Sequence, residues 1–266
     1  MKDTVRLTLP DGSVQQVPVG TPARAVAETV GPRLAKAAIA AQVEGEVWDL
    51  NRPIEIDASV EIITESDPRA LKVLRHSTAH VLATAVRKIF PAAGIGFGPA
   101  IEDGFYYDFE VPRPFTPDDL EAIEREMAEV VKQGFDFVRE EVTREEARER
   151  FKDDPLKLER LEELGDDEVI SVYTNGPFVD LCRGPHVQDT SRVKQFKLLH
   201  AAGAYWRGDS NRQMLQRIYG TAWFKKSDLD GVGASAVPGE ADELPDAHAG
   251  VCITATLVSR PTDASG

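Results

Sequence analysis

The alternation of apolar and polar residues at the start of the chain predicts a β-hairpin. Apolar Val5, Leu7 and Leu9 alternate with polar residues, and the same alternation resumes at Val17 and Val19. A period of two residues is typical of strands with one buried face. The intervening Pro-Asp-Gly sequence is typical of the tight turn that joins two antiparallel strands.

A short helix is predicted to follow the hairpin. Thr21 is placed to cap its N-terminus, Pro22 to occupy its first turn and Gly31 to end it. Its buried stripe is formed by small and branched residues, namely Ala23, Val26 and Val30. Two further strands are predicted around 39–43 and 60–63. The order strand, strand, helix, strand, strand predicts a β-grasp domain over residues 1–64, with 65–68 as its exit linker.

A long helix is predicted to begin at Asp67-Pro68. Its core face is marked by mostly apolar residues at helical spacing, namely Leu71, Leu74, Thr78, Leu82, Ala85 and Ile89. His76 and His80 lie about 140° and 180° round the helix from Leu71. We therefore expect both histidines to project together, away from that core face.

The remainder of the chain predicts an α+β second domain over residues 65–230. Glycines and aromatic residues crowd between Gly94 and Phe109, which favours tightly turned strands beside a cleft. Charged amphipathic helices are predicted for 116–132 and 143–164, and strands return over 169–200. Residues 231–266 are rich in Gly, Ala, Ser, Pro and acidic residues without helical periodicity, so we expect a disordered tail.

Composition is that of a globular protein. With 266 residues and 42% hydrophobic residues, two domains are expected. No apolar stretch approaches the length of a membrane helix, and the N-terminus lacks the apolar core of a signal peptide, so we expect a cytoplasmic protein. Two distant cysteines, Cys182 and Cys252, argue against a disulfide framework.

Charge is unevenly distributed along the chain. The net charge of −14 argues against indiscriminate binding to nucleic acid. Residues 183–226 nevertheless hold nine Lys or Arg against only Asp189 and Asp209. This stretch is either a local phosphate-binding surface or a solvated basic face.

Two motifs offer site chemistry. His76-Ser-Thr-Ala-His80 and Cys182-Arg-Gly-Pro-His186 together contain three of the five histidines and one of the two cysteines. One hypothesis is a Zn²⁺ ion bound by these four side chains, and the other is a metal-free centre in which a neutral histidine activates water. A third, structural interpretation makes the cysteine a small buried residue and the histidines incidental. Spacing does not choose among them.

With these motifs identified, the chain from Met1 to about Asp230 resembles the N-terminal half of a bacterial threonyl-tRNA synthetase. The resemblance rests on a β-grasp module of the TGS type, on both histidine motifs, and on three longer segments: Gly98-Pro-Ala-Ile-Glu-Asp-Gly-Phe-Tyr-Tyr-Asp108, Gly203-Ala-Tyr-Trp-Arg-Gly-Asp-Ser-Asn211 and Met214-Leu-Gln-Arg-Ile-Tyr-Gly-Thr-Ala-Trp223. The first histidine motif is also found in alanyl-tRNA editing proteins, which bind zinc.

The resemblance implies an editing hydrolase that removes serine from the acceptor end of tRNA for threonine. Serine lacks one methyl group of threonine, and such a difference gives a binding site only about 1 to 3 kcal/mol of discrimination. A second site that removes wrongly attached serine is therefore needed. By the resemblance, His76 and Lys157 orient and polarise water, while His80, Cys182 and His186 complete the catalytic pocket. We expect the substrate to contact Asp180, Tyr106 and Arg183. The expected tRNA contacts are basic residues, namely Arg192, Lys194, Lys197, Arg207 and Arg212.

The resemblance also implies what this chain is not expected to do. Editing in threonyl enzymes is expected to need no cofactor, and zinc, if bound, would be held by His76, His80, Cys182 and His186. The class II core with its ATP and zinc sites and the anticodon-binding domain are not seen, so neither aminoacylation nor the homodimer of the full enzyme is expected. The resemblance stops after Asp230, which suggests a truncated or frameshifted reading frame.

Two other functions stay open. One is a TGS-containing RNA-binding or regulatory module without catalysis, although no Gly-x4-Gly-Lys-Ser/Thr loop is present for a GTPase version. The other is a zinc-dependent alanyl-tRNA editing protein, which the TGS module and segment 203–223 argue against. Neither DNA nor a membrane is an expected partner.

Overall fold

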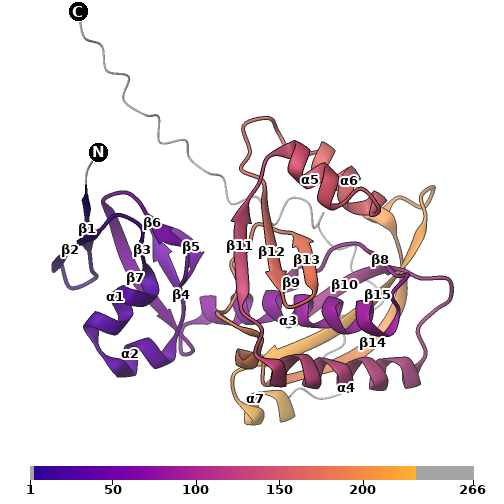
Figure 1. Ribbon diagram of the computed structural model, residues 1–266. Helices are drawn as coiled ribbons and strands as arrows, with labels where there is room; N and C mark the ends of the chain where they lie inside the picture. Colours follow the sequence, from indigo (N-terminus) through magenta and orange to yellow (C-terminus); the bar gives the residue numbers. More distant parts are fainter. Residues whose placement is uncertain (1–2, 232–266) are drawn as a thin grey trace, which may run out of the picture. The chain divides into compact units, whose positions relative to one another are not determined.

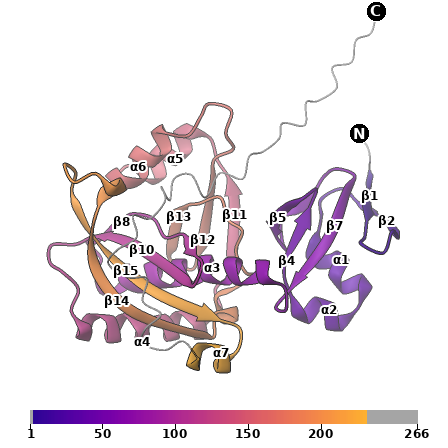
Figure 2. The same cartoon turned by 180° about the vertical axis from the view of Figure 1, so that it is seen from behind.

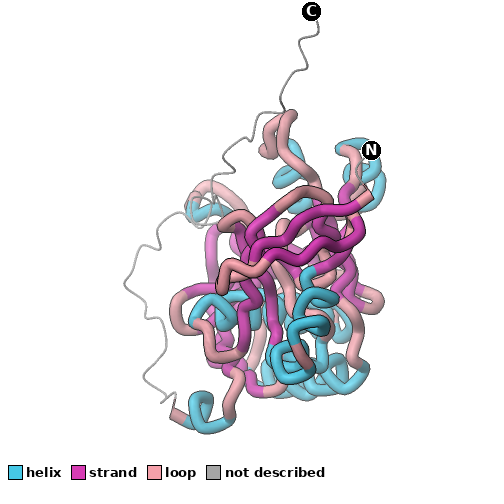
Figure 3. The backbone as a smooth tube through the Cα atoms, turned by 90° about the vertical axis from the view of Figure 1, so that its left-hand side faces the viewer, coloured by secondary structure: helices cyan, strands magenta, loops and turns pink. Residues whose placement is uncertain are grey.

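The computed structural model describes residues 3–231 of the chain (Figure 1). The predicted disordered tail, from residue 232 onward, lies outside the described residues. We call residues 3–64 the N-terminal module and residues 65–231 the second module. Helices and strands occur in both modules. Figure 3 distinguishes the two kinds of element by colour, and the fold class is α+β as predicted.

The N-terminal module is built on a five-stranded sheet of order β2-β1-β7-β4-β5. Its central pair β1–β7 is parallel and its other pairs are antiparallel, which is the β-grasp arrangement predicted from the sequence. Two short strands, β3 and β6, pair separately. The elements are β1 Thr4–Thr8, β2 Val14–Pro18, β3 Thr21–Pro22, α1 Ala23–Val30, α2 Pro32–Ala37, β4 Ala38–Val43, β5 Glu46–Asp49, β6 Pro53–Ile54 and β7 Ala58–Thr64.

The start of α1 differs from the sequence prediction. The hydroxyl of Thr21 donates to the carbonyl of Pro18 at 2.7 Å instead of capping the helix, and Thr21 and Pro22 are extended residues of β3. The helix therefore begins at Ala23, without a side-chain cap, and ends at Gly31 as predicted. Val30 is 50% exposed and is not part of the buried stripe, which Ala27 joins instead.

Helix α3 (Pro68–Ile89) is the centre of the second module and begins where the sequence predicts, with Asp67 as its cap. It packs against β10 and β15 of one sheet, against β13 of another and against α4 (Figures 1 and 2). Every residue from 77 to 86 is buried. The predicted stripe packs in the hydrophobic core, with Leu74, Leu82 and Ala85 among its buried residues. The histidine face, which was expected to point away from that stripe, is also largely enclosed, because α3 packs against strands of two different sheets.

The second module contains a five-stranded sheet and a three-stranded sheet. The five-stranded sheet has the order β14-β15-β10-β8, with β9 also paired to β10, and the three-stranded sheet has the order β11-β12-β13. The two sheets are antiparallel throughout. The elements after α3 are β8 Gly94–Ile95, β9 Ala100–Ile101, β10 Gly104–Glu110, α4 Pro117–Gln133, β11 Phe137–Glu141, α5 Arg144–Arg150, α6 Pro155–Glu162, β12 Ser171–Asn175, β13 Phe178–Leu181, β14 Gln195–Tyr205, β15 Met214–Trp223 and α7 Lys226–Asp230, with short 3-10 turns at Thr190–Arg192 and Trp206–Gly208.

The single helix predicted over 143–164 is two helices. Helix α5 ends at Arg150, and α6 begins anew at Pro155 with the side chain of Asp154 as its cap. Proline disfavours helical backbone at the preceding residue and lacks an amide N–H, so the Asp-Pro pair both breaks the first helix and starts the second. None of the helices within residues 3–231 has the length and apolar character needed to cross a lipid bilayer.

Candidate active site

The structure brings together the two histidine-containing motifs. Helix α3 supplies His76 and His80, and the turn after β13 supplies Cys182 and His186. Their donor atoms all lie within 4.8 Å of one another. The Cys182 Sγ atom is 3.3 Å from His76 Nε2 and 3.4 Å from His186 Nε2. We call these four residues the histidine cluster.

The turn that carries Cys182 and His186 has a tightly determined shape. The amide of Gly184 donates to Cys182 Sγ at 3.2 Å, with a φ of +74° that favours glycine. A Cβ atom at Gly184 would lie 2.1 Å from the hydroxyl of Tyr173, so no larger residue fits beneath the turn. These features explain why position 184, between Cys182 and His186, is occupied by glycine.

Two ring nitrogens of the cluster, one on His186 and one on His80, have polar partners that orient the rings. His186 Nδ1 lies 3.2 Å from the Ser77 hydroxyl, which also accepts from the amide of Val187 at 3.0 Å. His80 Nε2 lies 3.5 Å from Asp180, whereas the buried Nδ1 of His80 has no hydrogen-bond partner among the described residues. Three imidazoles and one thiol are a donor set suited to Zn²⁺, and the unpartnered His80 Nδ1 fits that use.

Aromatic side chains pack against His80 and His186 of the cluster. Phe137 stacks on His186 with ring centroids 4.7 Å apart, and Phe178 meets His80 edge-on at 5.8 Å. Burial lowers the pKa of His76 to about 4 and that of His80 to about 3. It also lowers the pKa of His186 and raises the pKa of the Cys182 thiol. Near neutral pH the cluster is therefore made of neutral imidazoles and a neutral thiol.

The cluster has an enclosed side and an accessible side. His80 and His186 are 2% and 1% exposed, whereas His76 and Cys182 are partly exposed. A substrate arriving from solvent therefore meets His76 and Cys182 first.

A buried ion pair adjoins the enclosed side. Lys157 pairs with Asp180, and both side chains are nearly inaccessible, at 3% and 4% exposed. Lys157 Nζ also donates to the carbonyl of Gly96 at 2.6 Å, and the Tyr107 hydroxyl donates to Asp180. Burial acts to raise the pKa of Asp180, but Lys157, His80 and Tyr107 together hold it below its usual value. Asp180 is thus an ionised carboxylate already engaged by three side chains.

Helix α6 places Lys157 in this position. Leu156 packs with Trp206, Leu215 and Phe97, and Glu159 accepts from the Trp206 indole at 3.2 Å. The glycine-rich segment 203–211 therefore anchors the helix that carries the lysine.

Two of the expected substrate contacts lie outside the cluster. Tyr106 is 2% exposed and lies under the guanidinium of Arg217, 3.8 Å from its ring centroid. Successive residues of a strand face opposite sides, so its neighbour Tyr107 reaches Asp180 instead. Arg183 forms an exposed ion pair with Glu168.

The basic residues expected to contact tRNA have varied surroundings. Arg207 and Arg212 both pair with Glu159. Arg192 donates to the carbonyls of Lys36 and Ala38. Lys197 is exposed on β14.

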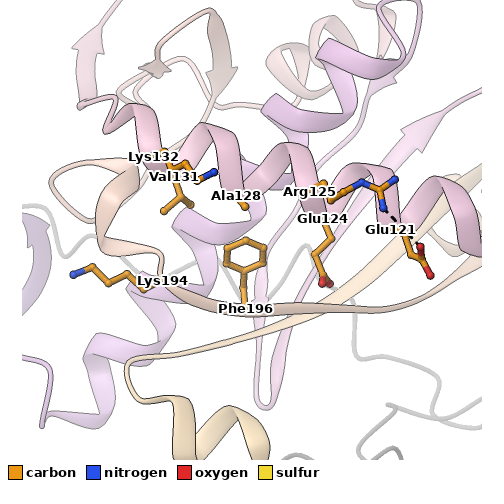
Figure 4. Close-up of a pocket in the computed structure, with 8 residues that line it drawn as sticks. All are labelled: Glu121, Glu124, Arg125, Ala128, Val131, Lys132, Lys194 and Phe196. Atoms are coloured by element: carbon orange, nitrogen blue, oxygen red, sulfur yellow. Dashed lines mark ion pairs between the residues drawn. The ribbon is translucent and has the colours of Figure 1, made fainter.

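Lys194 lines a surface hollow of about 550 Å³ between α4 and β14 (Figure 4). Its lining is mixed in charge and shares no residue with the histidine cluster: Glu121, Glu124, Arg125, Ala128, Val131, Lys132, Lys194 and Phe196. The figure shows Phe196 facing Ala128 of α4 and the charged side chains along the rim. The hollow is therefore separate from the candidate active site.

Several residues of the site were missed from the sequence. Tyr107 lies within a segment that the sequence analysis singled out, and the period of two along β10 would have offered it as the alternative to Tyr106. Ser77 lies inside the first histidine motif. Tyr173 and Asp49 gave no local signal, because only the folded chain brings them to the turn at 182–186.

Comparison with protein families agrees with this geometry. Residues 5–64 match the TGS domain, and residues 170–219 match the family described as the threonyl and alanyl tRNA synthetase second additional domain. The fold and site thus define a TGS domain joined to a second additional domain.

Similar proteins are threonine–tRNA ligases. That of Anoxybacillus flavithermus is 51% identical over 232 residues, which cover 86% of this chain and 36% of the relative. Threonine–tRNA ligase 1 of Bacillus subtilis is 49% identical over 232 residues, with the same coverage. That of Streptococcus mutans is 51% identical over 227 residues, covering 85% of this chain and 35% of the relative. The chain is therefore similar to part of these threonine–tRNA ligases, with matches to the TGS domain and the second additional domain, and it spans about a third of the length of these curated relatives.

Proposed function

We propose that the second module hydrolyses the ester bond between serine and the terminal ribose of tRNA for threonine. The observation that carries this proposal is the convergence of the histidine cluster with the buried Lys157–Asp180 pair. The first supplies neutral bases and the second supplies a fixed positive charge. The match to the second additional domain and the similarity to threonine–tRNA ligases support the choice of substrate class.

The proposed mechanism begins with His76 as the general base. Because burial keeps it neutral, its ring is free to take a proton from water as the water oxygen attacks the ester carbonyl. The ammonium group of Lys157 stabilises the negative oxygen of the tetrahedral intermediate. The bond to the ribose oxygen then breaks, and the proton held by His76 passes to that oxygen. Serine and free tRNA result.

Asp180 holds Lys157 in place in this scheme. For the substrate's ammonium group to bind Asp180, it has to share the carboxylate with Lys157, Tyr107 and His80. We therefore assign the amine contact to Asp180 only as a shared contact. Cys182 and His186 shape the pocket at the side that meets the ribose. A pocket that admits serine excludes threonine by its additional methyl group.

We propose that this hydrolysis needs no metal. If Zn²⁺ is bound, His76, His80, Cys182 and His186 would hold it, and it would act as a Lewis acid that lowers the pKa of a bound water. Four protein ligands fill the tetrahedral positions of zinc, which leaves none for that water. A zinc-dependent alanyl-tRNA editor is the second candidate function, because the same donor set fits the metal.

The test is deacylation of seryl-tRNA and threonyl-tRNA for threonine by the purified chain, with alanyl-tRNA as a third substrate. Each is measured with and without a chelator, beside His76→Ala and with the metal content determined. Selective, chelator-insensitive release of serine that His76→Ala abolishes is the expected result. Release that requires zinc and prefers alanine would establish the second candidate. No release from any substrate, by a folded chain, would contradict both.

A further inference from the structure

Asp49 of the N-terminal module lies against the candidate active site. It is the last residue of β5, and it accepts two hydrogen bonds from the second module. The first comes from the backbone amide of His186 at 2.7 Å, and the second from the hydroxyl of Tyr173 at 2.5 Å. A single carboxylate from one module thus binds both the site turn and the residue beneath it.

Both partners of Asp49 determine the position of the His186 ring. The amide belongs to His186 itself, and the Tyr173 ring lies 4.6 Å from the His186 ring. The Tyr173 hydroxyl also lies directly under Gly184, where a Cβ atom would not fit. Displacing Asp49 therefore releases the turn on two sides at once. The opposite side of the turn is held by Ser77 of α3.

Further contacts join β4 of the N-terminal module to the residues that follow the turn. Gln188 donates to the carbonyl of Ala38 at 2.9 Å, and Arg192 donates to the same carbonyl at 3.1 Å. Ile39, Ala40 and Ile63 of the N-terminal module belong to the hydrophobic cluster that also contains α3. These contacts use backbone acceptors and apolar packing, whereas Asp49 contributes a side-chain carboxyl group to the turn itself.

We propose that Asp49 is a positioning residue for the candidate active site, and that the N-terminal module is thereby a structural part of the hydrolytic centre. Asp49 holds the turn so that His186 Nε2 faces Cys182 Sγ and the His186 ring closes the pocket over the histidine cluster. This inference rests on the proposed function for its kinetic test, but its structural content stands apart from it.

The test compares Asp49→Asn, Asp49→Ala and Tyr173→Phe in the full chain with a matched control, Asp57→Asn. Asp57 is also an aspartate of the N-terminal module that accepts one backbone amide, from Arg6 at 2.9 Å, and a side-chain donor, the Arg6 guanidinium. It therefore controls for losing a hydrogen-bonded carboxylate in the same module.

We expect Asp49→Ala to lower kcat for deacylation of seryl-tRNA about 10- to 100-fold, because small displacements of catalytic groups have effects of that order. KM is expected to change less than kcat, because Asp49 does not touch the substrate. Asp49→Asn and Tyr173→Phe are expected to have smaller effects of the same kind. Asp57→Asn is expected to leave both constants unchanged. Unchanged kcat in Asp49→Ala would overturn the proposal.

A second measurement does not depend on activity. The amide and imidazole signals of His186 are followed by NMR in wild type, Asp49→Asn and Asp57→Asn. We expect both sets of His186 signals to move in Asp49→Asn and to stay in place in Asp57→Asn. Unmoved His186 signals would overturn the positioning role even if the wild-type chain hydrolyses seryl-tRNA. Moved signals in a wild-type chain that hydrolyses nothing would support the positioning role while contradicting the proposed function.

Discussion

The two modules differ in what they bury. The buried residues of the N-terminal module are hydrophobic, and all but Ile39, Ala40 and Ile63 form a cluster that includes Leu7, Val26, Ile54 and Val60. Within residues 3–231, all polar and charged residues that are buried lie in the second module, between Arg75 and Thr221. The N-terminal module buries apolar side chains, whereas the second module also buries hydrogen-bonding and charged side chains that need partners.

This difference indicates that the candidate catalytic groups lie in the second module. A buried polar group costs free energy unless it is hydrogen-bonded, and a buried charge costs more unless it is paired. In the second module this free-energy cost is offset by the Lys157–Asp180 ion pair, by the hydrogen bond from Tyr107 to Asp180, and by the polar partners of the histidine rings. Burial also sets the protonation states of those rings, so the same arrangement supplies the neutral bases that the proposed hydrolysis requires.

The largest effect is expected from breaking the buried ion pair. Lys157→Met leaves the Asp180 carboxylate buried without its cation, which typically destabilises a protein by about 3 to 5 kcal/mol. We expect a loss of that order in urea unfolding, together with loss of deacylation. The combined variant Lys157→Met/Asp180→Asn removes both charges, so it should recover part of the stability and none of the activity.

Lys152→Met is the matched control for that prediction. Lys152 also pairs with a carboxylate, that of Glu149, but the two side chains are 60% and 75% exposed. Water screens such a pair, so the unfolding midpoint should not move. Equal effects of Lys152→Met and Lys157→Met would show that burial does not set the importance of the pair.

The next effect concerns acid stability. The pKa values of His76 and His80, about 4 and about 3, lie below the value of about 6.5 in an unfolded chain. Below pH 6.5 the unfolded chain therefore binds protons that the folded site does not. By linkage these groups lower the free energy of unfolding as the pH falls from about 6.5 toward 4, and contribute no slope above that range.

Urea unfolding at several pH values, with a chelator present, measures this slope. Each buried histidine contributes up to about 1.4 kcal/mol per pH unit. We expect His80→Gln to have a shallower slope than wild type. His200→Gln should change it less, because His200 lies on β14 outside the cluster and is only partly buried. A free energy of unfolding that rises on acidification through this range would contradict the assignment of neutral buried rings.

The sequence predicted those elements whose determinants are local. The hairpin at the N-terminus follows from alternation and a turn, and α3 begins at Asp67, whose side chain accepts from the amide of Arg69 at 2.8 Å. Helix α4 begins after Thr116, which forms a capping box with Asp119. Such signals lie within a few residues of one another, so no knowledge of the fold is needed to recognise them.

Predictions that depended on distant neighbours were less accurate. His76 and His80 were expected to point away from the core stripe of α3, but the sequence did not show that Phe137 and Phe178, from strands far along the chain, would pack against His80. The hydrogen bond from Tyr107 to Asp180 was not predicted, because the orientation of β10 relative to β13 is not local information. The contact of Asp49 with His186 joins residues 137 positions apart, which no periodicity reveals.

The smallest effect tests the packing role of the N-terminal module alone. Ile54 is fully buried in its hydrophobic cluster. Ile54→Val removes one methyl-sized group, and such changes cost about 0.5 to 1.5 kcal/mol. We expect urea unfolding to show a loss of that size, with kcat and KM for deacylation unchanged well below the unfolding midpoint. Val14→Ala, at a position 58% exposed, is the control and should change neither quantity.

This last variant sharpens the contrast with Asp49→Ala. Both substitutions lie in the same module, but Ile54 contributes only apolar packing, whereas Asp49 binds the turn that carries His186. If the modules divide stability from chemistry as their buried residues indicate, a loss of packing lowers stability and leaves catalysis intact. A fall in kcat for Ile54→Val as large as that for Asp49→Ala would mean that the site depends on the general rigidity of the N-terminal module rather than on one carboxylate.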